Sequence, residues 1–251
     1  MCAKPVIGIV AKPLSELECP DDIWTEDYVK DEFRDMATTG GCVAIGVLPP
    51  FHGARYNGDE SAAVLRNNLS AEELADYEQV LGMCDGLVLQ GGLSGDYYEY
   101  HAARYALSVN MPIIGICAGF NTLCRAVGCD ITSAAALGLP PELHNVYSTS
   151  YRHEIRVRRG SELFGMFGVD SLAVNSLHTR FLDVRRAQEN PEVLVNATVS
   201  DVSTSGEPVE TVEAFTVPHA RYAMGFKWHP ELMEKEHQKG AFGPFLSACR
   251  G

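Results

Sequence analysis

One cysteine of this chain stands in a setting that suits a nucleophile. Cys117 lies between two glycines in the segment Gly-Ile-Cys-Ala-Gly, directly after the apolar run Pro112–Ile114. A strand that turns tightly into a helix between glycines presents one reactive atom above a sheet and places a helix N-terminus beneath it. On this motif alone, a buried core cysteine between two glycines is an alternative interpretation.

A thiol needs a base to become a strong nucleophile, and His229 is the best candidate among eight histidines. It follows an apolar segment, and Pro230 fixes the backbone after it. The Glu231 carboxylate could accept a hydrogen bond from the second imidazole nitrogen and hold the ring in the correct tautomer. In isolation, an ordinary surface loop is the alternative for these three residues.

The elements that must position these side chains alternate between strands and helices in the first half of the chain. Helical spacing of apolar residues, capping signals and glycine stops predict helices, and short apolar runs bounded by Pro or Gly predict buried strands. The predicted strands are residues 5–10, 42–48, 86–90 and 112–117, and the predicted helices are residues 26–39, 70–81, 96–109 and 119–126. Continuous apolar strands separated by helices indicate a parallel sheet that is covered on both faces.

Beyond Gly128 the pattern changes toward β structure. Short apolar segments are joined by polar turns, and a last helix is expected near the end of the chain; the segments are residues 157, 172–174, 193–195, 212–217 and 222–226, and the helix is 241–249. We find no repeat, low-complexity segment or linker. The sequence therefore predicts a single domain over residues 1–251, an α/β fold with an open, mostly parallel sheet and a partly antiparallel β extension.

Because chemistry in such a sheet gathers at the carboxyl ends of the strands, Cys117 and the pair Gly91-Gly92 are expected at one edge. Composition excludes other classes of function. The formal net charge of −13 argues against binding to a phosphate backbone, and no apolar run approaches a membrane span. The first residues lack a secretory segment, so we expect a cytoplasmic protein. The eight cysteines show no paired C-x-x-C spacing, so we expect mostly free thiols and no metal.

Taken together, the segments around Cys117 and His229 resemble the two signatures of class I glutamine amidotransferase-like proteins. The chain looks most similar to the stand-alone γ-glutamyl hydrolases of that superfamily, which have a flavodoxin-like fold. The supporting segments, in the family's order, are residues 4–9, 48–50, 89–92, 115–119, 174–178, 212–214 and 225–231. They span nearly the whole chain.

The resemblance implies a Cys-His-Glu triad of Cys117, His229 and Glu231 that cleaves a side-chain amide through a thioester. It implies an oxyanion site made by the backbone N–H groups of Gly92 and Ala118. It implies a small-molecule γ-glutamyl substrate and no cofactor, and it leaves a homodimer open. The residues expected to bind substrate are Gly91, Asn121, Asn175, Ser176, His178 and Lys227. Glu213 either contacts the site or is a structural partner of an arginine.

Several positions depart from the pattern of relatives that hydrolyse γ-glutamyl-γ-aminobutyrate. Ala118 stands where those relatives usually have Arg, and Asn121 and Lys227 stand where they usually have Gln. Two further functions therefore stay open beside a self-contained hydrolase. One is a glutaminase subunit that delivers ammonia to a separate synthase, and the other is a non-hydrolytic binder or acyl transferase on the same fold.

Overall fold

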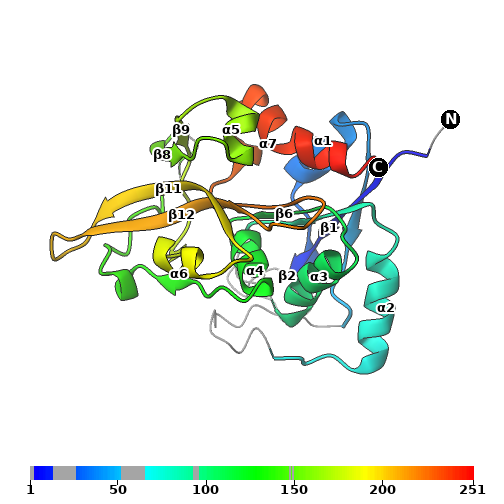
Figure 1. Ribbon diagram of the computed structural model, residues 1–251. Helices are drawn as coiled ribbons and strands as arrows, with labels where there is room; N and C mark the ends of the chain where they lie inside the picture. The colour runs from blue at the N-terminus through cyan, green and yellow to red at the C-terminus, as the bar shows by residue number, and fades with distance from the viewer. Residues whose placement is uncertain (1–2, 14–26, 52–65, 93–95, 147, 149) are drawn as a thin grey trace.

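A computed structural model describes residues 3–13, 27–51, 66–92, 96–146, 148 and 150–251. Figure 1 shows a central sheet with helices on both faces. In the described residues this sheet has nine strands, in the order β4-β1-β5-β6-β13-β12-β11-β8-β9. Their bounds are β1 Val6–Val10, β4 Val43–Val47, β5 Gly86–Leu89, β6 Ile113–Ile116, β8 His153–Val157, β9 Ser171–Val174, β11 Leu194–Val202, β12 Pro208–Thr216 and β13 Ala223–Phe226.

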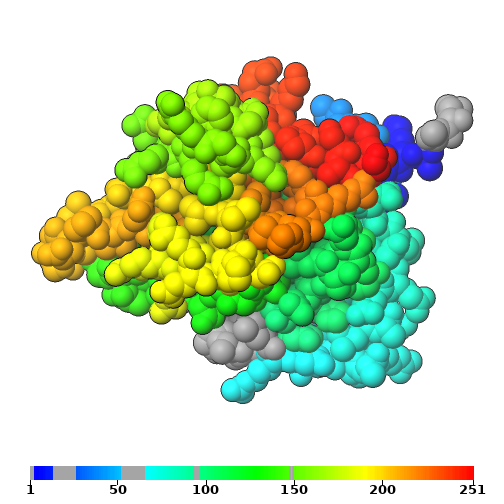
Figure 2. All heavy atoms as spheres, viewed as in Figure 1, coloured from blue at the N-terminus to red at the C-terminus, as the bar shows by residue number. Residues whose placement is uncertain are grey.

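The sheet changes direction at β13. The five strands from β4 to β13 pair in parallel, and the pairs from β13 to β9 are antiparallel. The long β11–β12 hairpin extends away from the helical layers (Figures 1 and 2). The prediction of an α/β, flavodoxin-like fold with a partly antiparallel extension is confirmed.

The helices cover both faces of this sheet. Their bounds are α1 Asp31–Thr39, α2 Ala71–Leu81, α3 Tyr97–Ser108, α4 Ala118–Ala126, α5 Glu162–Phe167, α6 Val184–Glu189 and α7 Lys235–Ala248. The remaining elements are short: β2 Lys12–Pro13, β3 Asp27–Tyr28, β7 Thr132–Ser133, β10 Arg180–Phe181, and the 3₁₀ turns η2 Ala135–Leu137 and η3 Pro230–Leu232. In the described part of the chain, no helix is long and apolar enough to cross a membrane.

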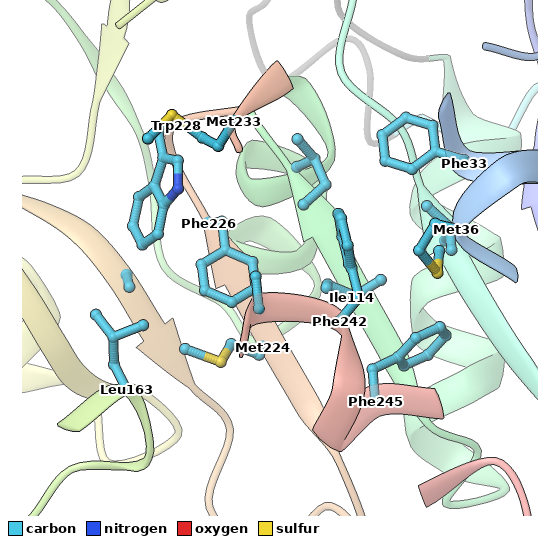
Figure 3. Close-up of a cluster of buried hydrophobic side chains, with 14 of the residues drawn as sticks. Phe33, Met36, Ile114, Leu163, Met224, Phe226, Trp228, Met233, Phe242 and Phe245 are labelled. Carbon is cyan, nitrogen blue, oxygen red and sulfur yellow. The ribbon is translucent and has the colours of Figure 1, made fainter. Parts of the chain in front are cut away.

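Two hydrophobic clusters hold the layers together, one on each face of the sheet. On one face, Phe33 of α1 and Phe242 of α7 meet edge to face, with ring centroids 6.4 Å apart, over the sheet residues Ile114 and Phe226 (Figure 3). On the other face, Phe120 of α4 meets Phe215 of β12 edge to face, in a cluster that also contains buried residues of α2, α3 and α6. Strand alternation explains this division, because successive side chains of the parallel strands enter opposite clusters.

Local signals predicted most helices well. Ser70 and Glu73 form the expected capping box at the start of α2, since each side chain bonds the other residue's backbone N–H. Two predicted helix starts were wrong. The first helix begins at Asp31, because Asp27–Tyr28 pairs with Lys12–Pro13 instead of joining the helix.

The last helix begins at Lys235 and continues past Pro244. Gly240, Gly243 and Pro244 weaken its sequence signal, while packing of Phe242 and Phe245 in the core holds it. The short helices α5 and α6 were not predicted. Cys2, Cys19 and the segment 93–95 lie outside the described residues, as does Glu26 at the predicted start of the first helix.

Candidate active site

Cys117 sits at the turn between β6 and α4, as the glycine pattern predicts. Its backbone has φ 53° and ψ −99°, a conformation that few side chains adopt. The flanking glycines permit close packing: a Cβ on Gly115 would lie 2.5 Å from the Gly119 carbonyl oxygen, and a Cβ on Gly119 would lie 2.0 Å from that of Leu89. The sulfur therefore stands at the N-terminus of α4, where backbone N–H groups lack intrahelical acceptors.

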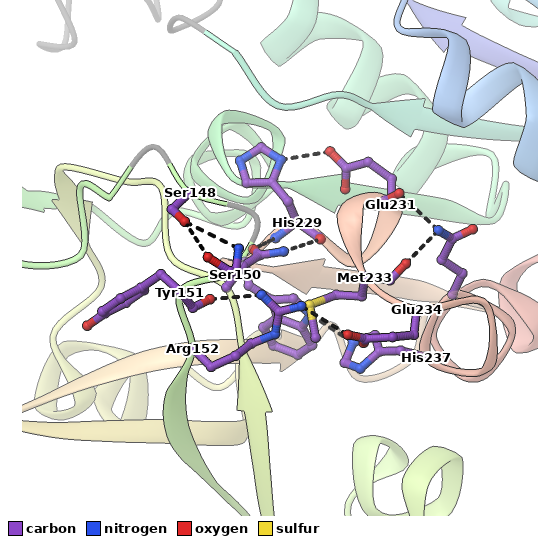
Figure 4. Close-up of polar contacts among 12 residues, drawn as sticks. Ser148, Ser150, Tyr151, Arg152, His229, Glu231, Met233, Glu234 and His237 are labelled. Atoms are coloured by element: carbon purple, nitrogen blue, oxygen red, sulfur yellow. Dashed lines mark hydrogen bonds and ion pairs between the residues drawn. The ribbon is translucent and has the colours of Figure 1, made fainter.

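His229 and Glu231 lie directly after β13, the strand that pairs with β6. His229 Nδ1 and Glu231 Oε1 are 2.7 Å apart, and both side chains are almost completely buried (Figure 4). The 3₁₀ turn Pro230–Leu232 brings the carboxylate back toward the ring two residues before it. The arrangement fixes the ring orientation and leaves Nε2 as the nitrogen that can exchange a proton.

Gly91, at the end of the neighbouring strand β5, brings the thiol and the imidazole together. A Cβ built on Gly91 would lie 2.6 Å from His229 Cε1 and 3.3 Å from Cys117 Cβ, so both side chains border the same small space. His229 Nε2 is buried and has no hydrogen-bond partner within the described residues. Cys117 borders the same space and interacts with the His229 ring.

Charges in the site favour a thiolate and an imidazolium. Burial opposes ionisation of the Cys117 thiol, but the charge of His229, an interaction with that ring and the ammonium groups of Lys227 and Lys30 lower the pKa of the thiol from 9.0 to about 7. Burial likewise opposes the charged form of His229, but Glu231 and Cys117 raise its pKa to about 10. The two groups therefore stabilise each other as an ion pair near neutral pH.

The expected binding residues divide into two groups in the structure. Asn175 uses its side-chain amide on the backbone of His229, accepting from the His229 N–H at 2.9 Å and donating to its carbonyl oxygen at 2.8 Å. Ser176 is completely buried, and its hydroxyl bonds His144. These contacts give Asn175 a role in positioning His229 and tie Ser176 to the supporting structure.

The other expected binding residues lie around the nucleophile. Leu177 places its carbonyl oxygen 3.5 Å from Cys117 Sγ, and neither ring nitrogen of the next residue, His178, makes a hydrogen bond within the described residues. Lys227 Nζ donates to Asn121 Oδ1 at 2.6 Å, so two of the positions that depart from the relatives contact each other. Gly92, next to Gly91, has φ 141°, a conformation suited to glycine.

The sequence analysis missed a buried polar cluster beside the site. Glu213 is fully buried, and its two carboxylate oxygens lie 3.6 Å from His178 Nε2 and 3.8 Å from His153 Nε2. His144 stacks on His178 and bonds Asp201. The titratable side chains nearest to the Glu213 carboxylate in this cluster are thus histidines. The only sequence signal was an acidic residue in the apolar strand 212–217.

The described cysteines carry free thiols. The described cysteines other than Cys117 are also buried and free: Cys42, Cys84, Cys124, Cys129 and Cys249. In the part of the chain that the structure describes, no group of three or more His, Cys, Asp or Glu side chains is arranged to hold a metal ion.

Comparison with known proteins identifies the family of this chain. The sequence profile of the family described as Peptidase C26 matches residues 93–231, more than half of the chain. The chain belongs to the peptidase C26 family. The matched region includes Cys117, His229 and Glu231 and ends at the last of them. This family assignment agrees with the class I glutamine amidotransferase-like fold that the sequence segments indicate.

Two curated relatives of this peptidase C26 member are similar at the same level. It is 27% identical over 202 residues to the γ-glutamyl-γ-aminobutyrate hydrolase of Escherichia coli, covering 69% of this chain and 75% of that protein. It is also 27% identical over 183 residues to a CTP synthase of Chlamydia trachomatis, covering 66% of this chain. That match covers 33% of the CTP synthase, so the similarity concerns about a third of the larger protein.

Solved structures show the same fold at low sequence identity. The glutaminase domain of Trypanosoma brucei CTP synthase with bound acivicin superposes with a TM-score of 0.63 at 13% identity, covering 98% of this chain and 94% of that domain. A glutamine amidotransferase from Thermotoga maritima gives a TM-score of 0.52 at 16% identity, covering 97% and 84% of the two chains.

Proposed function

We propose that this peptidase C26 member hydrolyses γ-glutamyl amide bonds of small molecules through a thioester on Cys117. The observation that carries the proposal is the buried arrangement of Cys117, His229 and Glu231, with the carboxylate 2.7 Å from the ring nitrogen that faces it. The similarity to a γ-glutamyl-γ-aminobutyrate hydrolase supports the choice of amide. The family assignment, a peptidase family, supports cleavage of an amide bond.

In the first half of the reaction, the Cys117 thiolate attacks the side-chain carbonyl carbon of the γ-glutamyl group. The C–S bond forms and the carbonyl electrons move onto oxygen. The oxyanion would be stabilised by the N–H of Ala118 at the start of α4 and the N–H of Gly92 beside the Gly91 contact. As the C–N bond breaks, His229 Nε2 gives its proton to the leaving amine, and a γ-glutamyl thioester remains.

In the second half, water attacks the thioester carbonyl and gives its proton to the now neutral His229. The C–S bond breaks, glutamate leaves, and the thiolate and imidazolium are restored. Glu231 stabilises the charged ring in both states, and Asn175 holds the backbone that carries the ring. The γ-glutamyl end would lie between Gly91-Gly92 and the strip from Asn175 to His178, which borders the sulfur through Leu177.

The proposal is tested with a panel of γ-glutamyl amines, following release of glutamate and of the free amine. Cys117→Ala should abolish both products, because no other group in the site can form the thioester. Cys84→Ala is the matched control, since Cys84 is also a buried free thiol but packs in the core next to Val80 and Gly8. Unchanged hydrolysis by Cys117→Ala would overturn the mechanism.

A second function has a specific observation in its favour. The chain resembles a glutaminase domain of CTP synthase and spans about a third of the CTP synthases it matches. A glutaminase subunit that passes ammonia to a separate synthase would use the same Cys117 chemistry. Glutamine hydrolysis that depends on a co-purifying synthase would favour this function, and efficient hydrolysis of γ-glutamyl amines by the chain alone would oppose it.

A further inference from the structure

A buried ammonium group stands next to the nucleophile. Lys227 is only 1% exposed. Its Nζ donates to Asn121 Oδ1 at 2.6 Å and lies 5.1 Å from the centre of the Phe120 ring. An amide oxygen and an aromatic face both favour the charged form of an amine. Burying an ammonium group costs desolvation free energy that burying a neutral side chain would not cost.

The register of the sheet places this ammonium beside the catalytic turn. Phe226 pairs with Ile116 in the parallel ladder of β13 and β6, and the Phe226 carbonyl accepts from the Cys117 N–H at 2.9 Å. Lys227 follows Phe226 and Cys117 follows Ile116, so both lie at the carboxyl ends of adjacent strands. Asn121 lies one helical turn from the nucleophile, and its N–H donates to the Cys117 carbonyl at 3.2 Å.

Other titratable groups face Lys227 from each packed element. The backbone carbonyl of Glu213 in β12 accepts from the Lys227 backbone N–H at 2.8 Å, so Glu213 is the residue opposite Lys227 on the neighbouring strand. His178 comes from the segment after β9, and burial and then the Lys227 charge lower its pKa well below the usual value. Cys124 of α4 also feels the Lys227 charge, after stronger effects of Cys129 and burial. The thiol of Cys117 responds in the same direction, after burial and His229.

We propose that Lys227 is a positioning residue that stabilises the Cys117 thiolate through its charge, and that Asn121 holds the ammonium where it can do so. The inference rests on the proposed function only in taking Cys117 as the nucleophile. It gives one role to Lys227 and Asn121, which contact each other and both differ from the residues usual in the relatives. His229 supplies the proton-exchanging partner, and Lys227 adds a fixed positive charge that does not leave during turnover.

The test measures alkylation of Cys117 by iodoacetamide as a function of pH, without substrate, by peptide mass spectrometry. The native chain should show a midpoint near pH 7. Lys227→Met keeps the side-chain length without the charge, and we expect the midpoint to rise by about one unit and the rate near neutral pH to fall about fivefold. Asn121→Ala should produce a smaller shift in the same direction. Lys239→Gln, on an exposed lysine of α7, should leave the profile unchanged.

A midpoint that stays near pH 7 in folded Lys227→Met protein would overturn the proposal and leave Lys227 a packing residue. If that variant does not fold, the double variant Asn121→Gln with Lys227→Gln replaces the ammonium by a neutral amide pair and must show the same upward shift. The experiment is independent of hydrolysis. A shifted midpoint in a protein that cleaves no γ-glutamyl amide would support the role of Lys227 and refute the proposed function.

Discussion

The Gly91→Ala substitution tests the alignment of the two reacting side chains directly. The added methyl group would start 2.6 Å from His229 Cε1 and 3.3 Å from Cys117 Cβ. The φ angle of Gly91 lies outside the range that is strained for other residues, so the substitution probes space and not backbone conformation. We expect it to displace the imidazole ring.

The size of the displacement follows from the contact distance. Ordinary carbon contacts begin at 3.4 Å, so the ring must retreat by about 0.8 Å from its starting distance of 2.6 Å. It cannot do so freely, because Glu231 holds Nδ1 and Asn175 holds the His229 backbone. A misplacement of about 1 Å can reduce turnover about 100-fold, which corresponds to about 2.7 kcal/mol of activation free energy.

The assay compares kcat for release of glutamate from a γ-glutamyl amine with thermal unfolding of the same preparation. Gly165→Ala in α5 is the matched control, because a Cβ there meets nothing within 4 Å and the change suits a helix. We expect a large loss of kcat in Gly91→Ala and none in the control. Full turnover by a folded Gly91→Ala protein would refute the assignment of His229 as the proton-exchanging group.

Three further predictions concern pH and stability. The value of kcat/KM should rise as pH passes about 7, where the Cys117 thiol ionises, and fall as pH passes about 10, where His229 loses its proton; a profile flat across both would contradict the ion pair. Asn175→Ala should lower the free energy of unfolding by about 1–3 kcal/mol and reduce kcat, because it leaves the buried His229 N–H without its acceptor and removes a bond to the His229 carbonyl, which then keeps its bond from the Leu232 N–H; denaturant titration and turnover check this. Lys12→Met should lower the free energy of unfolding by about 3 kcal/mol, because it leaves Glu99 buried without the ammonium that lies 2.6 Å away; adding Glu99→Gln should recover much of that loss, and no recovery would argue against the ion pair.

Sequence reasoning succeeded where the signal was local. The turn around Cys117 combines an apolar run with two glycines, and the packing distances show why no larger residue fits at Gly115 or Gly119. The helix starting after Ser70 carried its own capping box. In both cases neighbouring residues in the sequence impose the structure, so a pattern over a few positions is sufficient to predict it.

Contacts between distant segments account for what was missed. The first helix starts at Asp31 because Tyr28 pairs with Lys12 and because Gln90 accepts from the Lys30 N–H, contacts that span up to 60 residues. The Ser176 hydroxyl bonds His144, 32 residues away, a contact that the sequence did not predict. No local pattern contains such pairings.

The contact of Lys227 with Asn121 illustrates the same limit in the site itself. Each residue was noted separately as a departure from the relatives, and 106 positions separate them in the sequence. Only the parallel register of β6 and β13 shows that they meet beside Cys117. In the structure, the two residues that differ from the relatives form one arrangement, an ammonium group held by an amide oxygen, whose effect on Cys117 can be tested.

The central claim is a covalent γ-glutamyl thioester on Cys117, and mass spectrometry of acid-quenched reactions tests it most directly. Protein mixed briefly with a pool of γ-glutamyl amines should carry an acyl group of γ-glutamyl mass on the peptide that contains Cys117, and the group should disappear as substrate is consumed. The same acyl group on another cysteine, or active turnover in which Cys117 never carries it, would contradict the account.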